Sequence, residues 1–244
     1  MFLNHKTSNP AFSPFFWDKK ASSTNKMTVS GIFLKSFFCI SILTVVVAFV
    51  WHWYYEGNSI KWFASGGMLA AIVISIVISV RHQWVSFLVP LYALAKGVFL
   101  GAFSIQVHLQ YPNYPFQAVA ITIITFLVMI TLYKTKIIIL TKQLKSTIII
   151  ASATIFTVYI VTWILSFFGV NVSFVWGDNW FALAFNVFAA LTAAFSLLID
   201  IDFIDRKRNK APKSSEWLAT WGLLVTLIWL YIEVLRLMKR LAVR

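Results

Sequence analysis

The sequence predicts an all-α, polytopic integral membrane protein, and two observations carry that prediction. Hydrophobic residues make up 60% of the 244 residues and charged residues only 12%, with a mean hydropathy of +0.81. A soluble domain of this length could not cover so much apolar surface. The apolar residues are also gathered into long runs, and a helix needs about 20 such residues to span a bilayer.

Seven runs are long and apolar enough to span a membrane as helices. They lie at about 31–54, 60–80, 84–108, 114–133, 146–169, 180–204 and 215–240. Most of the 11 tryptophans fall near the ends of these runs, as in the aromatic belts of membrane proteins. We therefore expect two parts: a cytoplasmic or interfacial N-terminal arm at 1–29 and a seven-helix transmembrane domain at 30–244.

The distribution of basic residues predicts the partner and the orientation. A net charge of +13 would suggest nucleic acid for a soluble protein, but here lysines and arginines gather in short loops, as topology signals do. The lipid bilayer, and no nucleic acid, is the expected partner. The arm and the loops at 134–145 and 205–214 are basic, whereas 109–113 and 170–179 carry no lysine or arginine. This alternation predicts a cytoplasmic N-terminus, and seven crossings then place the C-terminus outside; an incomplete last crossing is the alternative.

Sequence signals for enzymes and metal sites are missing. The single cysteine, Cys39, provides no disulfide framework, and the four histidines have no ligand spacing. The sequence contains no nucleophile-elbow, zinc-protease or nucleotide-binding motif. It therefore predicts neither an enzyme nor a bound cofactor.

Three of the eight acidic residues, Asp200, Asp202 and Asp205, fall within six positions at the end of the sixth apolar run. Carboxylates in a membrane helix are costly, which makes them candidates for function. Helical spacing back from Asp200 passes small and polar residues, including Ser196 and Asn186, a face that packs on other helices or lines a cavity. Spacing back from Asp202 passes bulky apolar residues. We expect Asp200 to face the interior and Asp202 and Asp205 to share a face at the cytoplasmic rim; the alternative is one solvated cluster that ends the helix.

The last apolar run carries a second acidic residue of interest, Glu233. It shares a face with Thr226 and lies about 27 Å along the helix, toward its outer side. We then expect Asp200 and Glu233 to be two acidic sites at opposite ends of one polar path. Glu216 lies in the first turn, where a carboxylate interacts favourably with the helix dipole, so its expected role is structural.

Lys96 is the one basic residue expected near the bilayer midplane. It lies about 12 residues into the third run, beside a Gly97-x-x-x-Gly101 pattern that predicts a close-packing face. A carboxylate partner such as Asp200 would keep this lysine charged. The alternative is a lysine that snorkels toward the interface and has no role.

Five stretches of the sequence together are typical of one membrane-protein family. They are Ser8-Asn9-Pro10-Ala11, Met27-Thr28-Val29-Ser30-Gly31, the run from Pro90 to Gly101, Leu198-Ile199-Asp200-Ile201-Asp202-Phe203-Ile204, and the run from Glu216 to Leu237. Over nearly the whole chain they resemble a prokaryotic branch of the Bax inhibitor-1 family, the transmembrane Bax inhibitor motif proteins.

The resemblance implies six helices around a central seventh in a bacterial inner membrane. It also implies a pH-sensitive calcium leak in which two aspartates share a proton and close the pore. Asp200 matches the first aspartate, whereas Thr226 stands at the position of the second, and Lys96 at a place where some members carry glutamate. Because Ca²⁺ prefers several oxygen ligands, we expect Asp200 to bind it only weakly.

Residues and resemblance together predict a pH-responsive cation leak. Asp200 would be the gate and pH sensor with Lys96 as its counter-ion, and calcium would be cargo rather than a cofactor. The residues expected to line the path are Thr226, Glu233, Asn186 and Ser196. The alternative, which the resemblance also includes, is a non-transporting regulator that binds membrane proteases or other membrane proteins through its arm or basic loops.

Overall fold

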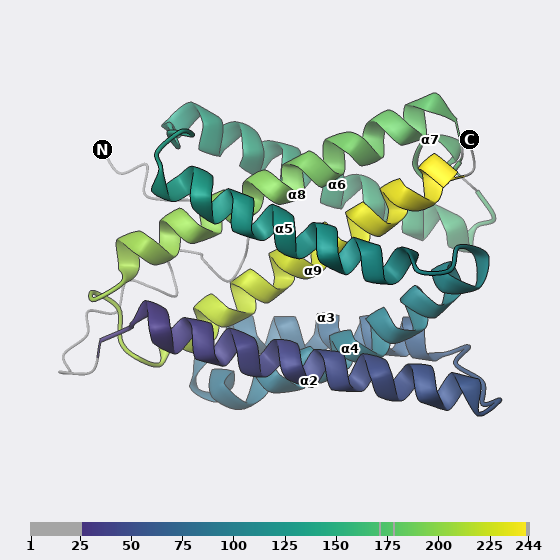
Figure 1. The fold of residues 1–244 in the computed structure, drawn as a ribbon, viewed down its shortest axis with the longest axis horizontal. Helices are drawn as coiled ribbons and strands as arrows, with labels where there is room; N and C mark the ends of the chain where they lie inside the picture. The colour runs from purple at the N-terminus through teal and green to yellow at the C-terminus, as the bar shows by residue number, and fades with distance from the viewer. Residues whose placement is uncertain (1–25, 171, 178, 243–244) are drawn as a thin grey trace. The chain divides into compact units, whose positions relative to one another are not determined.

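The computed structural model describes residues 26–170, 172–177 and 179–242, which form helices joined by short connections (Figure 1). The long helices are α2 (Val29–Tyr55), α3 (Phe63–Val80), α4 (Val85–Gln110), α5 (Tyr114–Lys134), α6 (Lys142–Phe167), α8 (Trp180–Lys207) and α9 (Ser215–Ala242). The 3-10 turn η2 (His82–Trp84) precedes α4, and the single turn α7 (Ser173–Trp176) precedes α8. Seven helices of the described part are long and apolar enough to cross a membrane, which confirms the predicted class. The interfacial role expected of the arm falls on residues 1–25, outside the described residues.

Local capping explains where two of the helices begin. The Thr28 hydroxyl accepts a hydrogen bond from the Gly31 amide at 3.1 Å, so α2 starts at Val29. Helix α6 starts four residues earlier than the expected 146, because the Thr141 hydroxyl accepts from the Leu144 amide at 3.2 Å. Hydropathy marks the apolar part of a helix, whereas the capping residue sets its true start.

The chain divides into two compact units, and each is described by itself. Among the described residues, unit 1 contains 113–203 and 225–242, with α5, α6, most of α8 and the C-terminal part of α9. Unit 2 contains 26–112 and 204–224, with α2, α3, α4, the end of α8 and the start of α9.

In unit 2, α4 packs on both α2 and α3, and glycines bring two of these backbones close together. A Cβ atom added to Gly97 would lie 2.8 Å from Val46 Cβ, and one added to Gly101 would lie 2.8 Å from Val50 Cβ. Any larger residue at either position would push α2 away. The predicted close-packing face of Gly97 and Gly101 is therefore confirmed, with α2 as its partner.

In unit 1, small residues give α8 a narrow buried face. Ala182, Ala189 and Ala193 are each 0% exposed, and the last two lie on the stripe behind Asp200 that was expected to pack on other helices or to line a cavity. The C-terminal part of α9 also contributes buried side chains to this unit, among them Leu230, Val234 and Leu235.

Candidate functional site

The polar residues predicted on the inner face of α8 are all buried in the structure. Asn186 is 1% exposed, Ser196 4% and Asp200 1%. Each forms a hydrogen bond with a side chain of another helix of unit 1, as the next paragraphs describe. We call this row and its partners on α6 and α9 the polar seam: Asn186, Ser196, Asp200, Ser152, Tyr159, Thr226 and Glu233.

Asp200 forms a hydrogen bond with Thr226 of α9. The Thr226 hydroxyl donates to Asp200 Oδ2 at 2.5 Å, and Thr226 is only 3% exposed. Thr226 is also the position at which the family resemblance expects a second aspartate. A hydroxyl therefore faces the Asp200 carboxylate here, and it can donate to the ionised form or accept from the protonated form.

The middle of the polar seam joins α8 to α6. The Ser196 hydroxyl donates to the Thr192 carbonyl at 2.9 Å, and it lies 3.1 Å from the Ser152 hydroxyl. Because the Ser196 proton is already used, Ser152 is the donor of this pair. Sequence reasoning did not select Ser152; its only signal is its place in the small-residue run Ala151-Ser152-Ala153.

Glu233 is a buried carboxylate at the centre of a hydrogen-bonded cluster. Its carboxylate accepts from Tyr159 Oη at 2.9 Å, Trp229 Nε1 at 3.1 Å and Asn186 Nδ2 at 3.3 Å, and it is 0% exposed. The Arg236 guanidinium lies 3.5 Å from Glu233 Oε1 and 4.6 Å from the centre of the Tyr159 ring. The Asn186 side-chain oxygen has no hydrogen-bond partner within the described part of the chain.

The sequence singled out Glu233 and Asn186 separately, and the structure brings them together. It did not select their partners. Trp229 and Arg236 stand four residues before and three residues after Glu233, a spacing that places all three on one side of α9 and could have identified them. Tyr159 comes from α6 and offers no such signal.

The other two aspartates of α8 have different environments. Asp202 is 4% exposed, forms an ion pair with Lys145 and accepts from the Tyr133 hydroxyl at 3.3 Å. Asp202 is therefore buried beside the start of α6 and the end of α5, which supply a cation and a hydroxyl, and its expected place at the cytoplasmic rim stays a prediction. Asp205 has a 44% exposed side chain and pairs with Arg208 at 3.2 Å, which suits a rim.

Lys96 belongs to unit 2, where thioether and aromatic groups surround its ammonium. Nζ lies 4.0 Å from Met68 Sδ, 5.2 Å from the centre of the Phe99 ring and 5.8 Å from that of Tyr92. Aromatic faces attract a cation and offset part of its burial cost. The pairing of Lys96 with Asp200 joins residues of different units and stays a prediction.

A comparison with protein families gives a match over nearly the whole chain. A family model described as Bax inhibitor 1 like matches residues 9–243, a range that includes every residue of the polar seam. No curated protein and no solved structure gave a match.

Proposed function

Because the chain belongs to the Bax inhibitor 1 like family, we propose that this multi-pass membrane protein is a pH-responsive cation leak with Asp200 as its gate. The observation that carries the proposal is the buried polar seam of unit 1. Polar side chains are costly inside a membrane, and continuous rows of them mark the paths of ions or protons.

The polar seam is long enough to serve as such a path. Ser196 lies four residues from Asp200, or about 6 Å along α8, and Asn186 lies a further ten residues, or about 15 Å. Glu233 joins Asn186 at that far end. The oxygen atoms along this row are hydroxyls, carboxylates and the Asn186 side-chain oxygen, which suit a hard cation.

The gate would act through the protonation state of Asp200. An ionised Asp200 accepts a hydrogen bond from the Thr226 hydroxyl, whereas a protonated Asp200 would donate one to it. The direction of the hydrogen bond between α8 and α9 would therefore reverse when Asp200 is protonated. Lys96 is the proposed counter-ion. With one carboxylate in place of two, calcium passes but is held weakly.

The proposed location is the bacterial inner membrane, with the N-terminus in the cytoplasm. The basic residues support this orientation, because the connections between α5 and α6 and between α8 and α9 are both rich in lysine or arginine. The end of the chain at Ala242 would then lie on the outer side.

Reconstitution in liposomes tests the gate. With a calcium dye inside, wild-type flux should differ between about pH 6 and about pH 8, and Asp200→Asn should remove that difference. Asp205→Asn is the matched control, because it makes the same change on the same helix at a half-exposed site. Equal flux of wild type and Asp200→Asn at both pH values would refute the gate.

Restoring a second carboxylate gives a complementary test. Thr226→Asp places an acid within hydrogen-bond reach of Asp200, and two such groups cannot both ionise readily. We expect calcium flux to become more strongly pH-dependent than in wild type. The Thr226→Asn variant, which has the same size and no charge, should not reproduce this effect.

A non-transporting regulator of membrane proteases or other membrane proteins is the second candidate. The observation that favours it is that buried carboxylates can serve as fixed ties between helices, as the Lys145–Asp202 pair does. Under this proposal the arm makes the contact. A variant that lacks residues 1–26 would lose the partner that the full chain captures, and neither protein would conduct ions.

A further inference from the structure

At the start of α9, Glu216 binds the start of α2. The Glu216 carboxylate is 0% exposed; it accepts from the Thr28 amide at 2.9 Å and from the Thr28 hydroxyl at 3.0 Å, and it forms an ion pair with Lys35. In a capping box, an acid of the same helix receives the amide of the capping residue. Here the Thr28 amide instead donates to an acid nearly 190 residues away in the sequence. A Cβ atom at Gly31 would collide with this carboxylate, so the approach requires glycine.

Main-chain hydrogen bonds attach the residues before α2 to the loop between α8 and α9. The Met27 amide donates to the Ala211 carbonyl at 2.9 Å, and the Asn209 amide donates to the Met27 carbonyl at 3.0 Å. Lys26 forms an isolated antiparallel bridge with Pro212. Met27 is 0% exposed and Ala211 2%. The loop is therefore held on both sides, by these bonds and by Glu216.

The end of α8, the loop that follows it and Lys26 together carry a dense positive charge. We call their charged residues the cationic platform: Lys26, Asp205, Arg206, Lys207, Arg208, Lys210 and Lys213. Six are basic and one is acidic, which leaves an excess of five positive charges. All the basic residues of the cationic platform except Lys207 are exposed. Its one acidic residue, Asp205, pairs with Arg208.

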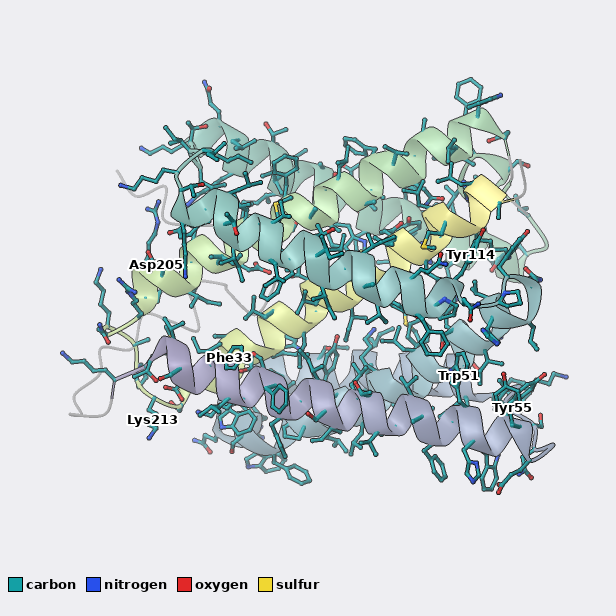
Figure 2. All side chains as sticks on the ribbon, in the orientation of Figure 1. Phe33, Trp51, Tyr55, Tyr114, Asp205 and Lys213 are labelled. Carbon is teal, nitrogen blue, oxygen red and sulfur yellow. The ribbon has the colours of Figure 1, made fainter. Side chains whose placement is uncertain are left out.

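The cationic platform lies where the apolar surface of α2 begins. Phe33, Leu34 and Phe37 are 69%, 65% and 63% exposed, as expected of side chains that face acyl chains. Figure 2 places Asp205 and Lys213 toward the end of α2 that carries Phe33, and Trp51 and Tyr55 at its opposite end. The positive charge thus lies near the end of an exposed apolar surface, as basic residues do at the end of a membrane-spanning helix.

We propose that the cationic platform is a binding site for the phosphate head groups of anionic phospholipids. The cations would bind the phosphate, and the exposed face of α2 would contact the acyl chains of the same molecule. A free phosphate or an acidic peptide would use only the first of these surfaces. The residues of this site belong to unit 2 and none of them belongs to the polar seam, so the proposal does not rest on the proposed ion path.

Lipid titration of the purified full chain tests the charges. Native mass spectrometry should show tighter binding of phosphatidylglycerol than of phosphatidylcholine with the same acyl chains or of inorganic phosphate. The triple variant Lys26→Gln/Lys210→Gln/Lys213→Gln should bind phosphatidylglycerol on the order of 100-fold more weakly, at about fivefold per lysine. The matched control, Lys134→Gln/Lys136→Gln/Lys142→Gln, removes three exposed lysines at the ends of α5 and α6 and should bind as wild type.

Two results of that titration would overturn the proposal. Equal weakening in both triple variants would mean that only the net charge matters. Binding of inorganic phosphate as tight as that of phosphatidylglycerol would mean that the acyl chains contribute nothing and that the site is not specific for lipid.

A second variant tests whether the fixed position of the cationic platform matters in addition to its charge, because the two explanations predict opposite changes in phosphatidylglycerol binding. Glu216→Gln adds one positive charge to this region, so a purely electrostatic surface would bind phosphatidylglycerol more tightly. If the cationic platform works because it is fixed, the loss of the Lys35 ion pair loosens it, and binding weakens by several-fold. Tighter binding in Glu216→Gln would refute the role of the fixed loop.

Discussion

Asp200 and Asp202 are two residues apart on α8, yet they have different kinds of partner. Both are buried, at 1% and 4% exposure. Asp200 receives the hydroxyl of Thr226, whereas Asp202 receives the ammonium of Lys145 and the hydroxyl of Tyr133. Residues two apart on a helix point about 200° from each other, so one helix presents two carboxylates to two different neighbours.

This difference separates a carboxylate held by a cation from one held by a hydroxyl. A buried ion pair fixes its two helices to each other, because removing one partner leaves the other charge buried without compensation. A hydroxyl partner can reverse its hydrogen bond instead. We therefore assign Asp202 to holding α5, α6 and α8 together and Asp200 to the proposed gate.

The largest expected effect comes from removing the cation of the fixed pair. Lys145→Met leaves Asp202 buried without its cation, and we expect the free energy of unfolding in detergent to fall by about 3–5 kcal/mol. Lys142→Met, at an exposed site in the same first turn, should change it by less than about 0.5 kcal/mol. The double variant Lys145→Met/Asp202→Leu should recover most of the loss; no recovery would mean that the Lys145 side chain matters for packing rather than charge.

A smaller effect is expected at the hydroxyl partner. Thr226→Val keeps the size of the side chain but removes its donor to Asp200, and we expect a loss of about 1–3 kcal/mol in the free energy of unfolding. The pH response of calcium flux should also change, because Asp200 loses the hydroxyl whose hydrogen bond would reverse when Asp200 is protonated. Thr226→Ser keeps the hydroxyl and is the control. If valine and serine at this position behave alike, the hydrogen bond has no role in the gate.

The sequence was sufficient to predict the helices and the direction of Asp200, but not the environment of Asp202. The seven spans follow from hydropathy, and the alanines and Ser196 behind Asp200 mark a close-packed face. The bulky apolar residues behind Asp202 include Leu198 and Ile199, which resemble a lipid-facing surface in sequence but are 0% and 3% exposed. In a membrane, apolar side chains suit both the lipid surface and the protein interior, so hydropathy cannot tell which of the two a bulky face meets.

For the same reason, the partners on other helices were found only in the structure. Lys145, Ser152 and Tyr159 all belong to α6, and helical periodicity gives the direction of a side chain without naming the helix that it meets. Glu233 is an example. Its partners on α9 could be predicted from their spacing along the helix, whereas its partner on α6, Tyr159, could not. The cross-helix contacts of a polar path need a three-dimensional structure.

The smallest expected effect is at Ser152, and it tests whether lining residues differ from the gate. Ser152→Ala removes one hydrogen bond, while Ser196 keeps its bond to Thr192, so the free energy of unfolding should fall by about 0.5–1.5 kcal/mol. Calcium flux should decrease at both pH values, because the polar seam loses an oxygen ligand, while the ratio of the two fluxes stays as in wild type. The uncharged hydroxyl of Ser152 does not titrate in this range. If Ser152→Ala lost the pH response of calcium flux, that response would depend on the hydroxyls of the polar seam, and Asp200 would not be the separate pH sensor that we propose.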